Sequence, residues 1–197
     1  LLLATNDGLF TCNMDRNLQK IRFLQYKRIP SNPKSISNNE VMALLRSRNG
    51  TIYAATYGGG LNIIEKEKLH TNDLKFSTLT TENGMMSDVI LNMCEDAQGM
   101  IWLVSEHCLM KYDPQKESFT NYSESLFKGD FSFSEVKPLK VTESKTMYFG
   151  TTQGILPINE QTVRKSNFKP KILFDTPPHI ELSPKEKSLS ISFAAID

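Results

Sequence analysis

Histidine is a common metal ligand and proton carrier near neutral pH, and this chain contains three of them. His70, His107 and His179 lie far apart along the sequence and show no spacing typical of metal ligands. We interpret His107 as a solvated loop residue beside two repeat strands, with ligand contact as the less favoured alternative. No pairing of a nucleophile with a base follows from the sequence, so we expect no catalytic residue, no metal site and no cofactor.

The other groups capable of chemistry have simpler structural interpretations. The sequence Tyr57-Gly58-Gly59-Gly60 is the only glycine cluster, and a phosphate-binding loop would open a helix and supply a lysine. Because Leu61-Asn62-Ile63-Ile64 continues as a strand, we interpret the cluster as a turn. The pair Glu95-Asp96 stands at a turn, where it is expected to shape a hairpin rather than perform acid/base catalysis.

Cysteine content and charge exclude several classes of protein. Cys12, Cys94 and Cys108 are too few for a disulfide framework and form no Cys-x-x-Cys pair, so we expect buried, reduced thiols. The 23 basic and 22 acidic residues of the 197 give a net charge of +1, which argues against a dedicated nucleic-acid binder. No apolar run is longer than that of Met100 to Val104, which is too short to cross a bilayer.

A repeat of about 50 residues organises the chain. Three similar stretches begin at Glu40, Asp88 and Glu135, and the opening LLLATNDGLF matches the second half of the same unit. A small hydroxyl residue follows the apolar triplet of each unit, at Thr5, Thr56, Ser105 and Thr151, with spacings of 51, 49 and 46 residues. A constant frame with loops of variable length is expected from such a pattern.

Each unit is predicted to be a four-stranded antiparallel meander, and no segment shows helical periodicity. Asn49-Gly50 is the strongest hairpin signal, because both residues accept a positive φ at little cost. The predicted strands are Val41–Leu45 and Val89–Cys94 (first), Ile52–Thr56 and Ile101–Ser105 (second), Leu61–Ile64, Leu109–Tyr112 and Ile155–Ile158 (third), and the more polar Lys20–Lys27, Leu74–Thr80 and Ser118–Tyr122 (fourth).

The predicted fold is all-β: a partial β-propeller of about three and a half four-stranded antiparallel blades in residues 1–174, then the first strands of an immunoglobulin-like β-sandwich in 175–197. The blade segments are about 1–35, 36–84, 85–131 and 132–174. Closed rings typically need ~4 to 8 blades, so we expect part of a longer array. Trp102 aligns with Tyr53 and Tyr148 as a packing position, and Gly50 aligns with Gly99 as a turn position.

The meander topology brings the connections between blades and the turns between second and third strands to one face. Planar hydrogen-bonding groups and aromatic faces bind sugars, so six polar or aromatic residues on this face are the candidates for ligand contact: Asn39, Tyr57, Asp88, Glu106, His107 and Gln153.

The unit that begins at Asp88 resembles the two-component regulator propeller repeat, in Glu95-Asp96, Gly99, Ile101-Trp102 and Tyr112-Asp113-Pro114. The segments Gly8-Leu9-Phe10 and Phe149 to Ile155 fit the same family, whereas Ala55, Val104 and Cys108 replace its usual glycines. Pro177 to Leu182 and Ser188 to Asp197 resemble the first strands of the immunoglobulin-like domain that follows the propellers there.

The resemblance implies the periplasmic sensor region of an inner-membrane hybrid two-component histidine kinase of Bacteroides type. Such a region would detect an oligosaccharide and relay the signal through a homodimer to polysaccharide-utilisation genes. Membrane contact would come only through a transmembrane segment outside this sequence, and no nucleic acid would bind here. The alternatives are a β-propeller scaffold for protein partners and, less favoured, a carbohydrate-active propeller enzyme.

Overall fold

The computed structural model describes residues 1–12, 18–65, 72–127, 131–141, 144–159, 171–174 and 193–196. In this described part the chain forms antiparallel sheets and contains no α-helix, only the 3₁₀ turns η1 (Leu18–Lys20), η3 (Thr81–Asn83) and η4 (Glu124–Phe127). The chain divides into two compact units, Leu1–Lys165 and Ser166–Asp197.

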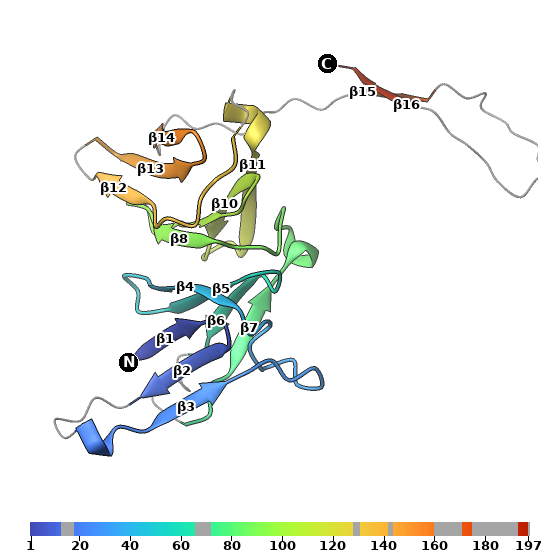
Figure 1. Ribbon diagram of the computed structural model, residues 1–197. Coiled ribbons are helices and arrows are strands. Elements are labelled where there is room, and N and C mark those ends of the chain that lie inside the picture. Colours follow the sequence, from blue (N-terminus) through green and yellow to red (C-terminus); the bar gives the residue numbers. More distant parts are fainter. Residues whose placement is uncertain are drawn as a thin grey trace, which may run out of the picture. The chain divides into compact units, whose positions relative to one another are not determined.

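Four antiparallel sheets follow one another along the first unit, each with its strands in sequence order (Figure 1). They consist of β1 (Leu2–Thr5), β2 (Gly8–Cys12) and β3 (Phe23–Tyr26); β4 (Val41–Arg46), β5 (Ile52–Thr56), β6 (Leu61–Ile64) and β7 (Phe76–Leu79); β8 (Asn92–Glu95), β9 (Ile101–Val104), β10 (Cys108–Asp113) and β11 (Ser118–Ser123); and β12 (Leu139–Val141), β13 (Thr146–Thr151) and β14 (Gly154–Asn159).

These sheets confirm the all-β prediction and its blade-like units. The two complete meanders, β4 to β7 and β8 to β11, coincide with the units predicted from Glu40 and Asp88. The first sheet has three strands, as expected from an opening that matches only the second half of a unit. Each predicted strand is present, with shifts of a few residues at its ends.

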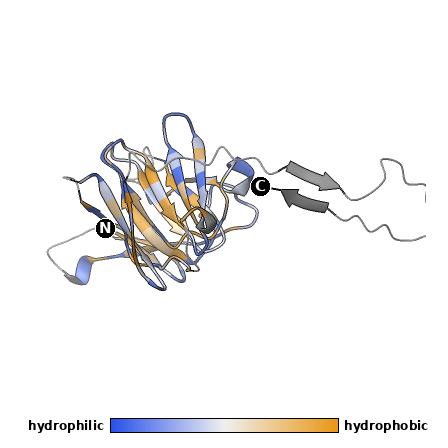
Figure 2. Cartoon of the chain, turned by 90° about the horizontal axis from the view of Figure 1, so that it is seen from above, coloured by the Kyte–Doolittle hydropathy of each residue, from blue (hydrophilic) through white to orange (hydrophobic). Residues whose placement is uncertain are grey.

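Apolar side chains fill the space between successive sheets, and Figure 2 shows that the hydrophobic residues lie on the strands and the hydrophilic ones in the connections. Three clusters of buried residues form the core, one for each pair of neighbouring sheets. Alternate residues of β9 enter different clusters: Ile101 and Leu103 pack toward β4 to β7, and Trp102 and Val104 toward β12 to β14. Since both faces of β9 are covered, an uninterrupted apolar run is what this strand requires.

The aromatic repeat position faces the next sheet in chain order. Tyr53 is 2% exposed and meets Tyr112 of the following sheet edge to face at 6.4 Å, and Trp102 is fully buried, 6.0 Å from Phe149 between ring centroids. Tyr148 is only half-buried. It points away from the β8 to β11 sheet, which its neighbours Met147 and Phe149 contact instead.

The turns between first and second strands differ from the prediction in one detail. Gly50 and Gly99 adopt φ of +86° and +85°, as their turn positions require, but Asn49 does not have a positive φ. Its side-chain Oδ1 instead accepts hydrogen bonds from Ser47 Oγ at 2.7 Å and Thr51 N at 2.9 Å. Asn49 therefore stabilises this turn by an Asx-type hydrogen bond rather than by a left-handed backbone.

Asp96 organises the corresponding turn from within the core, where it is 2% exposed. Its Oδ1 accepts from the backbone N–H groups of Gln98 and Met100, both at 2.9 Å, and its Oδ2 accepts from Trp102 Nε1 at 3.0 Å. The hairpin-shaping role is confirmed, because the buried carboxylate serves the turn and the core tryptophan together. Cys12, Cys94 and Cys108 are buried and form no disulfide.

The second unit is described through β15 (Lys171–Phe174) and β16 (Phe193–Ile196), which pair antiparallel. The division after Lys165 differs from the predicted boundary at 174/175, because residues 171–174 pair with β16 rather than extending the last blade. Most of the predicted sandwich segment, residues 175–192 and 197, lies outside the described residues. The immunoglobulin-like assignment stays a prediction.

Replacing Trp102 by alanine should lower the free energy of unfolding by about 3 to 5 kcal/mol, because it leaves a large cavity and removes a donor to buried Asp96. Chemical denaturation measures the loss. Phe23→Ala is the matched control, since Phe23 is 57% exposed and should cost little. Equal effects of the two changes would contradict the packing described here.

Burial raises the pKa of Tyr53 to about 12, with smaller contributions from Tyr112 and Glu95. An unfolded tyrosine titrates near pH ~10, so between about pH 10 and 12 the unfolded chain loses this proton before the folded chain does. Folding stability should therefore fall across this interval, and Tyr53→Phe should make the fall shallower. Denaturation at a series of alkaline pH values measures it, and identical slopes for both proteins would refute the assignment.

Candidate functional site

The candidate residues lie on one side of the sheets, which we call the loop face. It comprises the turns between second and third strands and the connections between sheets. Backbone hydrogen bonds join these two kinds of segment repeatedly: Gly8 N to Asn39 O at 2.6 Å, Tyr57 N to Glu40 O at 3.0 Å, Gly60 N to Asp88 O at 2.8 Å, Phe133 N to Glu106 O at 2.8 Å and Thr152 N to Ser132 O at 2.9 Å. The loop face is thus a hydrogen-bonded band that continues across all four sheets.

The repeated hydroxyl residue holds the turns of this band. The Oγ1 atoms of Thr5, Thr56 and Thr151 donate to the carbonyl oxygens of the turn glycines Gly8, Gly60 and Gly154, at 2.7, 2.9 and 3.1 Å. In the third unit Cys108 occupies the glycine position. There Ser105 Oγ donates to Ser87 Oγ at 3.1 Å, and Ser105 N donates to Cys108 O at 3.0 Å. The spacing found in the sequence therefore marks one structural position.

Tyr57 and Glu106 are the two candidates that the structure brings into contact. They come from the β5–β6 and β9–β10 turns of neighbouring sheets, and Tyr57 Oη donates to Glu106 Oε1 at 3.5 Å. Tyr57 is 39% exposed, and Glu106 is exposed as well. An accessible aromatic ring beside a carboxylate provides a stacking surface and a hydrogen-bond acceptor for a ligand on this face.

The side chains of Asn39 and Asp88 form hydrogen bonds with other residues of the protein. Asn39 Oδ1 accepts from Arg28 N at 2.8 Å, which ties β3 to the connection before β4. Both carboxylate oxygens of Asp88 accept from Thr81, Oδ1 from its N–H at 2.7 Å and Oδ2 from its hydroxyl at 3.2 Å. These two side chains position the loop face.

His107 and Gln153 are exposed residues of the β9–β10 and β13–β14 turns. Gln153 N donates to Thr151 Oγ1 at 3.3 Å as part of the hydroxyl-held turn. The six candidates come from the turns and connections of all four sheets, so they follow the band of the loop face.

The glycine cluster is a tightly packed turn, as expected. A Cβ on Gly59 would lie 2.6 Å from Ser37 Oγ and 2.8 Å from Thr56 Oγ1, and one on Gly60 would collide with the Leu79 carbonyl. The cluster lets the β5–β6 turn approach two neighbouring connections closely and leaves Tyr57 at the surface. It does not cradle an anion, since strand β6 follows it.

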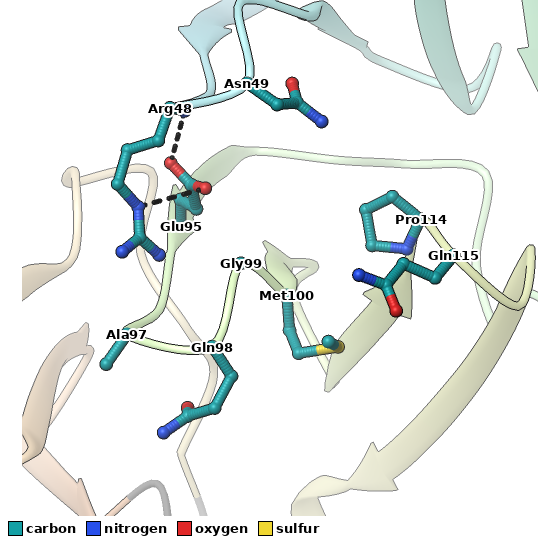
Figure 3. Close-up of a pocket in the computed structure, with 9 residues that line it drawn as sticks. All are labelled: Arg48, Asn49, Glu95, Ala97, Gln98, Gly99, Met100, Pro114 and Gln115. Carbon is teal, nitrogen blue, oxygen red and sulfur yellow. Dashed lines mark hydrogen bonds and ion pairs between the residues drawn. The ribbon is translucent and has the colours of Figure 1, made fainter.

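A cavity of about 270 Å³ lies at the turns on the opposite side, between the second and third sheets (Figure 3). It is lined by Arg48, Asn49, Glu95, Ala97, Gln98, Gly99, Met100, Pro114 and Gln115. Sequence reasoning missed it, because its walls come from three turns that are separate in the chain. Asp113 anchors one of them: burial acts to raise its pKa, but hydrogen bonds from Gln115 N and Lys116 N and the Lys116 charge outweigh this and lower it.

Within the described ranges, no group of three or more His, Cys, Asp or Glu side chains could hold a metal ion. The same ranges contain no helix of the length and apolarity that crossing a membrane would need.

Comparison with solved structures identifies proteins with the same fold. This chain shares its fold with the extracellular domain of BT4673 from B. thetaiotaomicron. One structure, described as a proposed one-component system, matches 83% of this chain at 17% identity with a TM-score of 0.58. A second, described as a proposed hybrid two-component system, matches 85% at 15% identity with a TM-score of 0.60.

The chain spans about a fifth of these proteins, 20% and 22% of their lengths. The extracellular domain of BT3049, a proposed hybrid two-component system of the same organism, matches 97% of this chain and 30% of its own at 18% identity, with a TM-score of 0.44. No protein-family model and no curated protein matches the sequence, so the resemblance to the regulator repeat rests on the quoted residues alone.

Substituting Thr56 by valine should lower the free energy of unfolding by about 0.5 to 1.5 kcal/mol, because Thr56 is fully buried and the Gly60 carbonyl would lose one of its two donors and keep only the Thr56 backbone N–H. Thr151→Val removes the same hydrogen bond at a partly exposed position, where water can replace it, and should cost less. Denaturation midpoints of the two variants compare them. A larger loss for Thr151→Val would contradict the proposed role of the hydroxyl.

Proposed function

We propose that this chain is part of the extracytoplasmic signal-sensing region of a hybrid two-component sensor histidine kinase. The observation that carries the proposal is the fold shared with the BT4673 extracellular domain over more than four fifths of the chain. In this proposal the chain itself is not an enzyme, and it lies in the periplasm as part of an inner-membrane protein.

An oligosaccharide is the proposed signal, and the loop face is the proposed recognition surface. The exposed ring of Tyr57 offers a face for a sugar ring, and the Glu106 carboxylate beside it can accept hydrogen bonds from hydroxyl groups. His107 and Gln153 add polar groups to neighbouring turns of the same band. The glycine turn and Asp88 would hold these groups in place through Gly58 N and Gly60 N.

Rigid-body movement is the proposed means of relay. The continuous cores between sheets favour motion of the stacked sheets as one piece, so binding would change how this piece contacts its neighbours in a homodimer. The signal would then reach polysaccharide-utilisation genes through kinase, receiver and DNA-binding parts outside this sequence.

Calorimetric titration of the whole ectodomain with a panel of polysaccharide fragments tests this function. At least one fragment should bind, and Tyr57→Ala should weaken it by about tenfold or more through loss of the stacking face. Phe23→Ala is the matched control, since Phe23 is 57% exposed on β3 and pairs with Cys12 at the end of β2 away from the loop face, and it should leave affinity unchanged. Binding of no fragment, together with capture of a folded protein partner, would favour the scaffold function instead.

A further inference from the structure

We propose that the cavity between the β4–β5, β8–β9 and β10–β11 turns is a second binding site, which takes an uncharged polyhydroxylated ring. It lies at the other ends of the same strands from the loop face, so the two sites share no residue.

The cavity is shaped by two sheets that are fixed to one another at this point. Arg48 of the β4–β5 turn donates from its backbone N to Glu95 Oε2 at 2.9 Å and from Nε to Glu95 Oε1 at 3.2 Å. Its Nη2 also donates to the Asp96 carbonyl. Because these contacts join residues of different sheets, the two turns hold a defined separation, and Pro114 and Gln115 of the third turn line the other side of the open cavity (Figure 3).

The two charged residues that line the cavity, Arg48 and Glu95, form an ion pair with each other. Glu95 is 13% exposed at its side chain, and both of its carboxylate oxygens face Arg48 (Figure 3). An anionic ligand would meet this carboxylate, and a cationic ligand would compete with Arg48 for it. Neutral ligands avoid both costs, so the site favours an uncharged molecule.

Side-chain amides supply the remaining polarity. The backbone N–H groups of Gln98, Met100 and Gln115 are bound to Asp96 and Asp113, so they hold the turns. Asn49 Oδ1 accepts hydrogen bonds from Ser47 Oγ and Thr51 N, so the Asn49 side chain also holds its turn. Figure 3 shows the carboxamide of Gln115 directed toward the space. A carboxamide both donates and accepts, as a hydroxyl group does, so a ring with several hydroxyls can form hydrogen bonds with it.

The size of the cavity and the residues around it argue against a large apolar ligand and against an extended peptide. About 270 Å³ accommodates one ring, and the apolar patch provided by Met100, Pro114 and Ala97 is small. Turns rather than strand edges bound the cavity, so an extended peptide would find no row of unpaired backbone groups to add to. A hexose unit and a free cyclitol share the favoured chemistry.

Saturation-transfer NMR and calorimetry with glucose, galactose, mannose and myo-inositol test the site, with glucuronate as the charged counterpart. At least one neutral ring should bind the 197-residue protein with a Kd on the order of 1 mM. A hexose that binds without myo-inositol identifies a sugar residue as the occupant, and the reverse identifies a cyclitol. Glucuronate should bind at least about tenfold more weakly than the best neutral ring.

The double variant Gln98→Ala/Gln115→Ala should weaken that binding by about tenfold or more, because both side chains line the cavity and lie on exposed turns. Lys116→Ala is the matched control: it is the next residue of the same turn, is 79% exposed at its side chain and does not line the cavity, so it should have no effect. Tyr57→Ala should also have no effect. Binding of no neutral ring, equal binding of glucuronate, or unchanged affinity in the double variant would overturn the proposal.

Discussion

Burial of apolar side chains between neighbouring sheets is the interaction on which this structure depends. A four-stranded meander of this length cannot cover its own two faces, so each sheet here takes its core from the next one. The second strand of a unit shows this most clearly, since β5 and β9 place alternate residues in two different clusters. Removing one sheet would therefore expose a face of each of its neighbours, and the stability of any unit is shared with the units beside it.

The cores between the sheets constrain the strands, but they leave the side chains in the turns at both strand ends free to vary from unit to unit. At the loop face, turns held by the repeated hydroxyl residue and backbone hydrogen bonds recur from unit to unit, while the exposed residue that follows the hydroxyl residue changes from Tyr57 to Glu106 to Thr152. At the other end, Asp96 and Asn49 form their turns by different hydrogen bonds on the same frame. Such variation of surface groups on a constant scaffold is what a recognition module requires.

The strands, their order and the repeat could be predicted from sequence, because the apolar runs of β5 and β9 and the spacing of Thr5, Thr56, Ser105 and Thr151 are local signals. Contacts between distant segments could not. Nothing near Arg48 indicates that it will meet Glu95, and nothing near Lys171 indicates β16 as its partner rather than the preceding blade. The hydrogen bonds of Asp88 with Thr81 could not be predicted for the same reason, since a polar loop residue looks the same in the sequence whether its side chain binds a ligand or another part of the protein.

Amide hydrogen exchange tests most directly the claim that the sheets share a continuous core. If they do, the amides of β5 and β9, covered on both faces, will exchange most slowly and with similar free energies of opening, and those of the outer strands β7 and β11 will exchange faster. Sheets that open independently, with β5 and β9 differing widely or exchanging as fast as β7 and β11, would contradict the account.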